Sequence, residues 1–342
     1  MSHIPTHTAI STALAALLLS SCLFHQGIEP DPATLQELQQ MGVLQSVEDV
    51  NNKRLSSGAT LLIDAAEKGD VYLVDKLLRV GADPNGRGYS INAVPLTRTQ
   101  SPAVVNSLVG ADADVNVADD TGTTPLSRAL STGNDSGARL LLSKGAAVVP
   151  AFPADPPLLV VRDLAMAQQL IAEGADVNQT SARGVTPLMR AVGRNDEALA
   201  RFYIEQGADV TLADADGNTA LHAARSAAMV QLLCGAGANP AAVNAKGETA
   251  LFDILHTPDT VQAMVQAGVP LNVISSASGM TALLSMLSDA REDDDSILIL
   301  IRAGADVQLR TPKGDTALSL AQQRKSKRRI ALIRALLQRG AQ

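Results

Sequence analysis

The sequence is poor in the side chains that nucleic-acid recognition needs. It contains no Trp, and aromatic residues make up only 2 % of the 342 residues. Few flat rings are therefore available to stack against nucleobases. The net charge of −7 adds electrostatic repulsion from nucleic acid and from anionic membrane surfaces. We therefore expect neither nucleic acid nor a bare lipid surface as the ligand.

Side chains that bind metals or carry out catalysis are also scarce. The chain has two Cys and five His. His256 has Asp253 and Asp259 at three-residue spacings, but no second His or Cys completes a metal site. The sequence has no GxSxG or HExxH motif and no phosphate-binding Gly loop. We therefore predict no metal, no cofactor and no enzymatic activity.

One pattern is repeated along most of the chain. It is clearest from Asp216 to Pro240, DGNTALHAARSAAMVQLLCGAGANP. Asp-Gly predicts a turn, Thr219 is a suitable N-cap for a helix from Ala220 to Arg225, and Gly237 ends a second apolar helix. Two such short helices cannot bury their apolar faces alone, so copies must pack on either side.

The copies extend from Gly58 to Gln342, in about nine units. Thr-Pro-Leu or Thr-Ala-Leu recurs before the first helix, and a Gly ends the second helix at intervals of 29 to 36 residues. The shorter intervals predict units that lack most of a helical turn, in the connection between their two helices. Asp112 takes the place of the Gly in the second unit, where a left-handed conformation costs about 1 kcal/mol.

This pattern resembles the ankyrin repeat family, whose unit of ~33 residues carries a T-P-L-H-x-A signature. The resemblance implies an all-α repeat solenoid of helix-turn-helix units with projecting turns, and a protein-binding function. In that family, partners contact the projecting turns and the concave face of the first helices, and the His of the signature, here His222, bonds the turn. The corresponding candidate positions here are Asp119, Asp120, Asp214, Asp216, Asn244, Lys246, Arg310 and Lys313. These turns change from acidic to basic along the chain, which could orient a dipolar partner; the alternative is that they are merely solvated.

The N-terminal segment predicts export. An apolar run from Thr12 to Leu19 is too short to span a bilayer but suits a signal peptide. It ends in Leu19-Ser20-Ser21-Cys22, which resembles the lipobox of bacterial lipoproteins and would make Cys22 the lipid-attachment site. The first 21 residues lack Lys and Arg, unlike most signals. An ordinary cleaved signal and a disordered tail are the alternatives.

These observations divide the chain into four predicted segments. They are a signal peptide at residues 1–21, a lipid-anchored tether at 22–32, an N-terminal capping segment at 33–57 and the repeat domain at 58–342. Cys234 would then be the only remaining thiol, so no internal disulfide is possible. We expect it to be a buried core residue, since a reactive thiol needs an exposed electropositive setting.

The predicted function is that of a monomeric, lipid-anchored periplasmic protein that binds or scaffolds another protein. Leu23 after the lipobox favours the outer over the inner membrane, by resemblance to enterobacterial sorting rules. An immunity-type neutraliser of a periplasmic toxic enzyme is one alternative, and a non-lipidated secreted or periplasmic binder is another. An enzyme hidden in the tether or in the degenerate fourth unit (157–178) is the third. Residues 313–342 carry a local charge of +7, which predicts either a polar terminal cap or a site for an acidic ligand.

Overall fold

The computed structural model describes residues 30–46, 49–52, 55–88, 93–148, 156–253, 257–289, 294–323, 327, 330, 331, 333 and 334. The lipobox with Cys22, His256 and most of the basic C-terminal cluster lie outside these residues. The chain divides into two compact units, Met1–Arg162 (unit 1) and Asp163–Gln342 (unit 2). The border falls inside the degenerate fourth repeat. No helix of the described part is long and apolar enough to cross a membrane.

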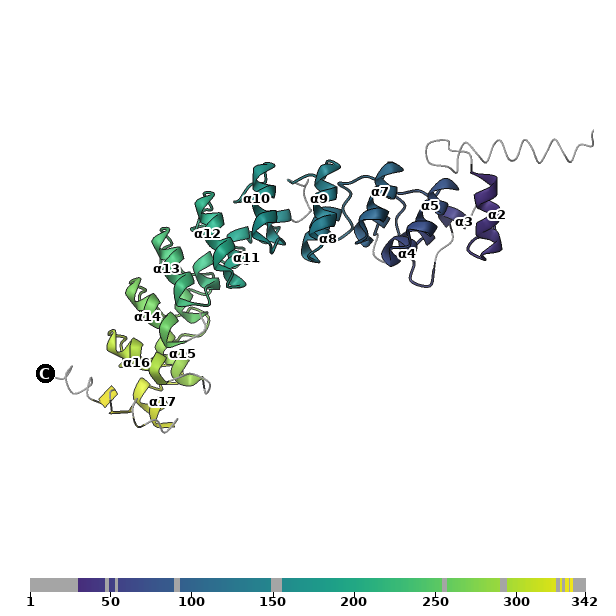
Figure 1. Ribbon diagram of the computed structural model, residues 1–342. Coiled ribbons are helices and arrows are strands. Elements are labelled where there is room, and N and C mark those ends of the chain that lie inside the picture. Colours follow the sequence, from purple (N-terminus) through teal and green to yellow (C-terminus); the bar gives the residue numbers. More distant parts are fainter. Residues whose placement is uncertain are drawn as a thin grey trace, which may run out of the picture. The chain divides into compact units, whose positions relative to one another are not determined.

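Unit 1 is a stack of helix pairs in which first helices pack on first helices and second helices on second (Figure 1). An N-terminal segment contributes α2 (Pro32–Gln40) and α3 (Asp49–Asn52). The first helices are α4 (Leu61–Lys68), α6 (Pro95–Arg98), α8 (Pro125–Ser131) and the 3-10 turn η2 (Pro157–Leu159). The second helices are α5 (Val71–Arg79), α7 (Pro102–Gly110) and α9 (Asp135–Ser143).

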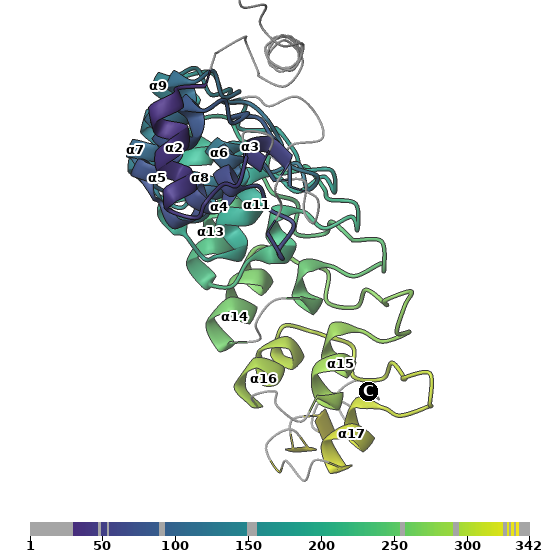
Figure 2. The same ribbon diagram turned by 90° about the vertical axis from the view of Figure 1, so that its right-hand side faces the viewer.

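Unit 2 continues the same pattern, beginning with the second helix α10 (Leu164–Ala172). Its first helices are α11 (Pro187–Gly193), η3 (Ala220–Ala223), η4 (Ala250–Phe252), α15 (Ala282–Ser288) and α17 (Ala317–Gln323). Its other second helices are α12 (Glu197–Glu205), α13 (Ala227–Gly235), α14 (Pro258–Gln266) and α16 (Asp294–Arg302). Figure 2 shows the turns between these repeats projecting to one side, next to the first helices.

Local capping explains why a Thr precedes most of the first helices; Val94 and Pro156 stand in its place before α6 and η2. The side chain of Thr186, for example, accepts a hydrogen bond from the backbone N–H of Met189 at 3.1 Å. Pro187 occupies the first helical turn, where a missing N–H costs nothing. Leu188 in the same helix is 1 % exposed, so the Thr-Pro-Leu motif supplies a cap, a helix start and a core residue in succession.

The helix-ending positions adopt the left-handed backbone that the sequence predicts. Gly237 has φ +97° and Gly81 has φ +90°. Asp112, which replaces Gly in the second repeat, also lies in this region with φ +62°. This angle confirms the prediction for Asp112. Asp tolerates the left-handed conformation better than most side chains.

In the short repeats the first helix is shorter. The sequence predicts that the connection between the two helices would be shorter instead. Where the two N-caps are ten positions apart, as from Thr186 to Asp196, the first helix has seven or eight residues. Where they are seven apart, the first helix has four residues: α6 follows Val94, and the 3-10 turn η3 follows Thr219. The expected helix from Ala220 to Arg225 is thus wrong in length and type. Every described second helix from α5 to α16 keeps nine residues, because these helices carry the continuous apolar stack.

An Asn side chain clamps several repeats to the next one. Asn178 donates its amide to the carbonyl of Gly207 at 3.2 Å and accepts from the backbone N–H of Asp209 at 2.8 Å. The carbonyl that the preceding helix leaves unpaired is satisfied in this way. Asn85 and Asn116 make the equivalent pair of bonds in unit 1.

The N-terminal segment packs on the first repeat as a partial copy of a repeat. Helix α2 packs against α5, with Leu38 fully buried. Glu37 accepts hydrogen bonds from Lys76 and Tyr72, which hold the pKa of this carboxyl below its usual value. Asn51 clamps the loop after Gly81 as the Asn residues of the repeats do. These contacts attach the segment to the first repeat, and a capping role for residues 33–57 stays a prediction from the sequence.

Candidate functional site: a groove beside the first helices of unit 2

The candidate site is built on a recurring turn whose first residue folds its side chain inward. Asp214 accepts hydrogen bonds from the backbone N–H groups of Asp216 (2.9 Å) and Asn218 (2.8 Å). Asn244 repeats this arrangement one unit later, and Asp119 does so in unit 1. Asp and Asn suit this position because their short side chains mimic a backbone turn.

This geometry corrects one expectation about the predicted binding turns. Asn244 is only 7 % exposed, and the side chain of Asp119 is 8 % exposed. These side chains, with that of Asp214, hold the turns in shape. A Lys at Asp119 or Asp214 would remove the hydrogen bonds that shape the turn. Any loss of partner binding in such a variant could then come from the altered turn. Asp120, Asp216, Lys246, Arg310 and Lys313 are exposed at their turns, as expected.

Main-chain hydrogen bonds join four consecutive turns of unit 2 into one ridge, the turns that contain Arg183, Ala215, Ala245 and Ser276. The N–H of Ala215 donates to the carbonyl of Arg183 at 2.8 Å, and that of Ala245 to Asp216 at 2.9 Å. The N–H of Ser276 donates to the carbonyl of Lys246 at 2.8 Å. Because each tip is bonded to the next, the ridge presents its exposed side chains at fixed spacings, and little ordering entropy remains to be lost on binding.

His222 supports the ridge from below. Its Nδ1 accepts from the backbone N–H of Thr219 at 3.1 Å, and its Nε2 donates to the carbonyl of Glu248 at 3.2 Å. The side chain is 5 % exposed. The expectation that this His bonds the turn is confirmed. Among the described residues, no group of three His, Cys, Asp or Glu is placed to hold a metal ion.

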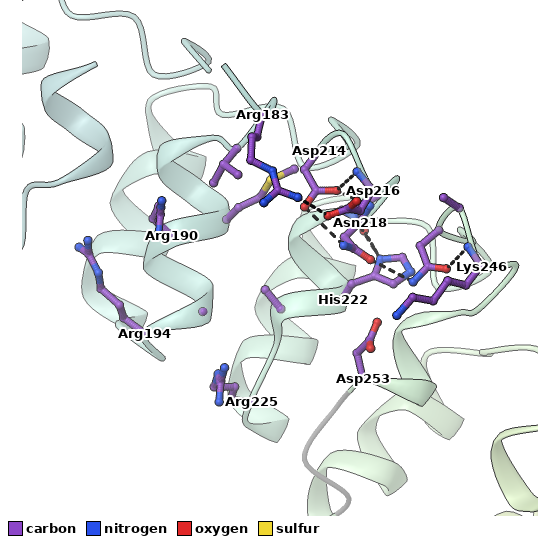
Figure 3. A pocket seen from close by; sticks show the side chains of 17 residues that line it. Arg183, Arg190, Arg194, Asp214, Asp216, Asn218, His222, Arg225, Lys246 and Asp253 are labelled. Carbon is purple, nitrogen blue, oxygen red and sulfur yellow. Dashed lines mark hydrogen bonds and ion pairs between the residues drawn. The ribbon is translucent and has the colours of Figure 1, made fainter. Parts of the chain in front are cut away.

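Between the ridge and the first helices α11, η3 and η4 lies an open groove of about 790 Å³. Four of the eight predicted turn residues line it: Asp214, Asp216, Asn244 and Lys246. Figure 3 shows their turns at the upper edge of the groove, with the side chains of α11 and η3 below. Arg310 and Lys313 lie in a turn further along unit 2, and Asp119 and Asp120 belong to unit 1, so none of these lines the groove.

The groove is cationic although the whole chain is acidic. Its lining includes five cationic side chains and three carboxylates. Arg183 pairs with Asp216 at 2.9 Å, and Asp214 is bonded into its turn. Arg190, Arg194 and Arg225 lie together on the side away from the ridge (Figure 3). The predicted turn residues did not include these three.

Two local signals mark these arginines in the sequence. Arg190 and Arg194 are four positions apart on and just after α11, so they share one face of the helix. Their mutual repulsion costs about 0.2–0.5 kcal/mol, which the favourable interaction of cations with a helix C-terminus offsets. Arg225 directly precedes Ser226, the N-cap of α13. Only the stacking of repeats shows that the three share one groove.

Cys234 differs from the buried residue that the sequence predicts. It is half-buried on α13, where burial raises the pKa of its thiol. A raised pKa lowers the fraction of reactive thiolate. The thiol is therefore on the flank of the second helix, not in the core, and it does not line the groove.

Comparison with known proteins agrees with this architecture. Residues 160–244 match the family model for ankyrin repeats (3 copies). The crystal structure of the human ASB11 ankyrin repeat domain is 24 % identical, with a TM-score of 0.54; the match covers 62 % of this chain and 99 % of that one. The chain has the ankyrin repeat fold. No curated protein matches it.

A second solved structure is less similar. It contains the Bd0816 predatory endopeptidase from Bdellovibrio bacteriovorus in complex with immunity protein Bd3460. The matching chain is 24 % identical with a TM-score of 0.43, and the match covers 50 % of this chain and 91 % of that one. Ankyrin repeat domains are typically protein-binding modules and usually non-catalytic. In the ankyrin fold of this chain, the groove lies between turns and first helices, where a partner could reach both.

Proposed function

We propose that this protein is a non-enzymatic protein-binding module whose partner occupies the groove of unit 2. The observation that carries the proposal is the bonded ridge of turns beside an open groove of about 790 Å³. A rigid edge lowers the entropic cost of association. Side chains at the edge, such as Lys246, and at the groove floor, such as Arg225, can contact one partner at the same time.

Site-specific photo-cross-linking tests this proposal. We expect p-benzoylphenylalanine in place of Lys246, which lines the groove, to form a discrete adduct with one protein in living cells. The control carries p-benzoylphenylalanine in place of Gln231, which is exposed on the second helix α13, and it should form no adduct. Mass spectrometry identifies the adduct. Equal adducts from both positions, or none from the groove position, would contradict the proposal.

The identified partner would also separate scaffolding from immunity. If the partner is an enzyme and its activity falls in proportion to the adduct, the protein neutralises it. If the partner keeps its activity, the protein holds it in place. The sequence predicts holding or scaffolding first and immunity as the alternative, and the groove can serve either role.

We further propose that the protein is anchored to the bacterial cell envelope through Cys22, facing the periplasm. The support is the sequence alone, Leu19-Ser20-Ser21-Cys22 after an apolar run. Several acyl chains at about 0.8 kcal/mol per buried methylene would hold it stably. We expect Cys22→Ala to move the protein from the membrane fraction to the soluble fraction. Cys234→Ala is the matched control and should leave it in place. A wild-type protein already soluble after fractionation would refute the anchor.

A further inference from the structure

We infer that the groove of unit 2 recognises an acidic segment of its protein partner through Arg190, Arg194 and Arg225. The inference rests on the proposed protein-binding function and specifies the chemistry of the segment bound there. Asp and Glu side chains of the partner would face this arginine cluster.

The first support is the placement of the three side chains. All three are exposed, and all line the same groove. Arg190 lies in α11 and Arg194 directly after it, and Arg225 comes from the next repeat, just before the N-cap of α13. Figure 3 shows them together on one side of the groove. A guanidinium group offers two parallel N–H donors, which match the two oxygens of a carboxylate.

The second support is that the equivalent arginines of unit 1 are neutralised. Arg98 and Arg128 occupy the same position as Arg190, four residues after the N-cap. Arg98 pairs with Glu67 at 2.6 Å, and Arg128 lies 3.8 Å from Asp119. Within the described part of the chain, neither Arg190 nor Arg225 forms an ion pair. Arg190 and Arg225 are therefore not neutralised as Arg98 and Arg128 are.

A protein segment fits this charge better than nucleic acid does. Among the described residues that line the groove there is no Phe, Tyr or Trp, so these residues offer no platform for stacking bases. The net charge of the whole chain is −7, which disfavours the approach of a long polyanion. A short acidic segment on an otherwise neutral or basic partner avoids that repulsion.

Charge reversal in the full-length cross-linking protein tests the inference. In the background with p-benzoylphenylalanine at position 246, we expect R190E/R194E/R225E to reduce the adduct yield at least about tenfold, since repulsion slows association and weakens binding. The neutral variant R190Q/R194Q/R225Q should give an intermediate yield. It keeps the test valid if the charge-reversed variant fails to fold. Arg302→Glu is the matched control: Arg302 is exposed at the C-terminal end of α16 and should leave the yield unchanged.

Competition identifies the chemistry of the ligand. A blocked hexaglutamate peptide should lower the adduct yield of the parent protein, whereas hexaglutamine should not. An unchanged yield in both arginine variants would overturn the acidic-segment inference and leave the proposed function intact. Stronger competition by oligothymidylate of equal charge than by hexaglutamate would also overturn it. Absence of any adduct from the parent protein would overturn the proposed function and the inference together.

Discussion

Replacing Leu221 with Ala should lower the free energy of unfolding by about 2–5 kcal/mol, the usual cost of removing a buried Leu side chain. Leu221 is 1 % exposed. It lies in η3, which packs on α11, η4 and α13. The cavity would therefore disturb three neighbouring elements in the middle of unit 2. Urea denaturation followed by circular dichroism measures the loss.

The matched control for this prediction is Leu320→Ala. Leu320 is also buried, at 7 % exposure, but it lies in α17, the first helix of the last repeat. In a one-dimensional stack, damage spreads only to adjacent repeats. Hydrogen exchange should therefore show lost protection on both sides of η3 in the first variant and only near α17 in the second. Equal loss throughout unit 2 in both variants would contradict nearest-neighbour stacking.

Replacing Gly217 with Ala should destabilise unit 2 more than the same change at Gly237. Both residues are left-handed, with φ +78° and +97°, so each substitution carries about 1–2 kcal/mol of backbone strain. At Gly217 the new Cβ would also lie 2.9 Å from the backbone N of Ala245, whereas nothing lies within 4 Å at Gly237. The turns would have to separate, breaking the bond from Ala245 to Asp216 and costing at least about 1 kcal/mol more.

The same pair of variants connects the ridge to binding. Opening the turns at Gly217 should also reduce cross-linking from position 246, because the rigid edge of the groove is lost. Gly237→Ala leaves the turns in place and should keep the adduct. Similar urea midpoints for the two variants would show that the turns do not depend on one another.

The sequence was sufficient for those features that are decided within one repeat. Thr186 as an N-cap, Gly237 as a left-handed helix end and Asp112 in the same conformation all depend on residues a few positions apart. Their chemistry is local, so a single copy of the motif predicts it. The repetition of such copies then predicts a stack, because no pair of short helices can bury its apolar face alone.

Features that depend on several repeats were predicted less well. The first helix of the sixth repeat shrinks to a 3-10 turn, since the second helices keep their length and the missing residues must come from elsewhere. Cys234 is half-buried because neighbouring helices cover only part of its side of α13. Asn244 looks like a solvated turn residue in the sequence. In the structure its side chain accepts hydrogen bonds within the turn and donates one to the side chain of Asn218 at 3.0 Å.

The arginine cluster illustrates the same division. The sequence by itself determined that Arg190 and Arg194 share a helix face, because residues four apart always do. The repeat pattern in the sequence also places Arg225 after the first helix of its repeat. Only the tertiary structure decided that Arg225 joins them in one groove and that Glu67 and Asp119 neutralise the equivalent arginines elsewhere. Whether two charges from different repeats meet depends on the stacking of backbones and on side-chain direction, and neither is encoded in the spacing of a single motif.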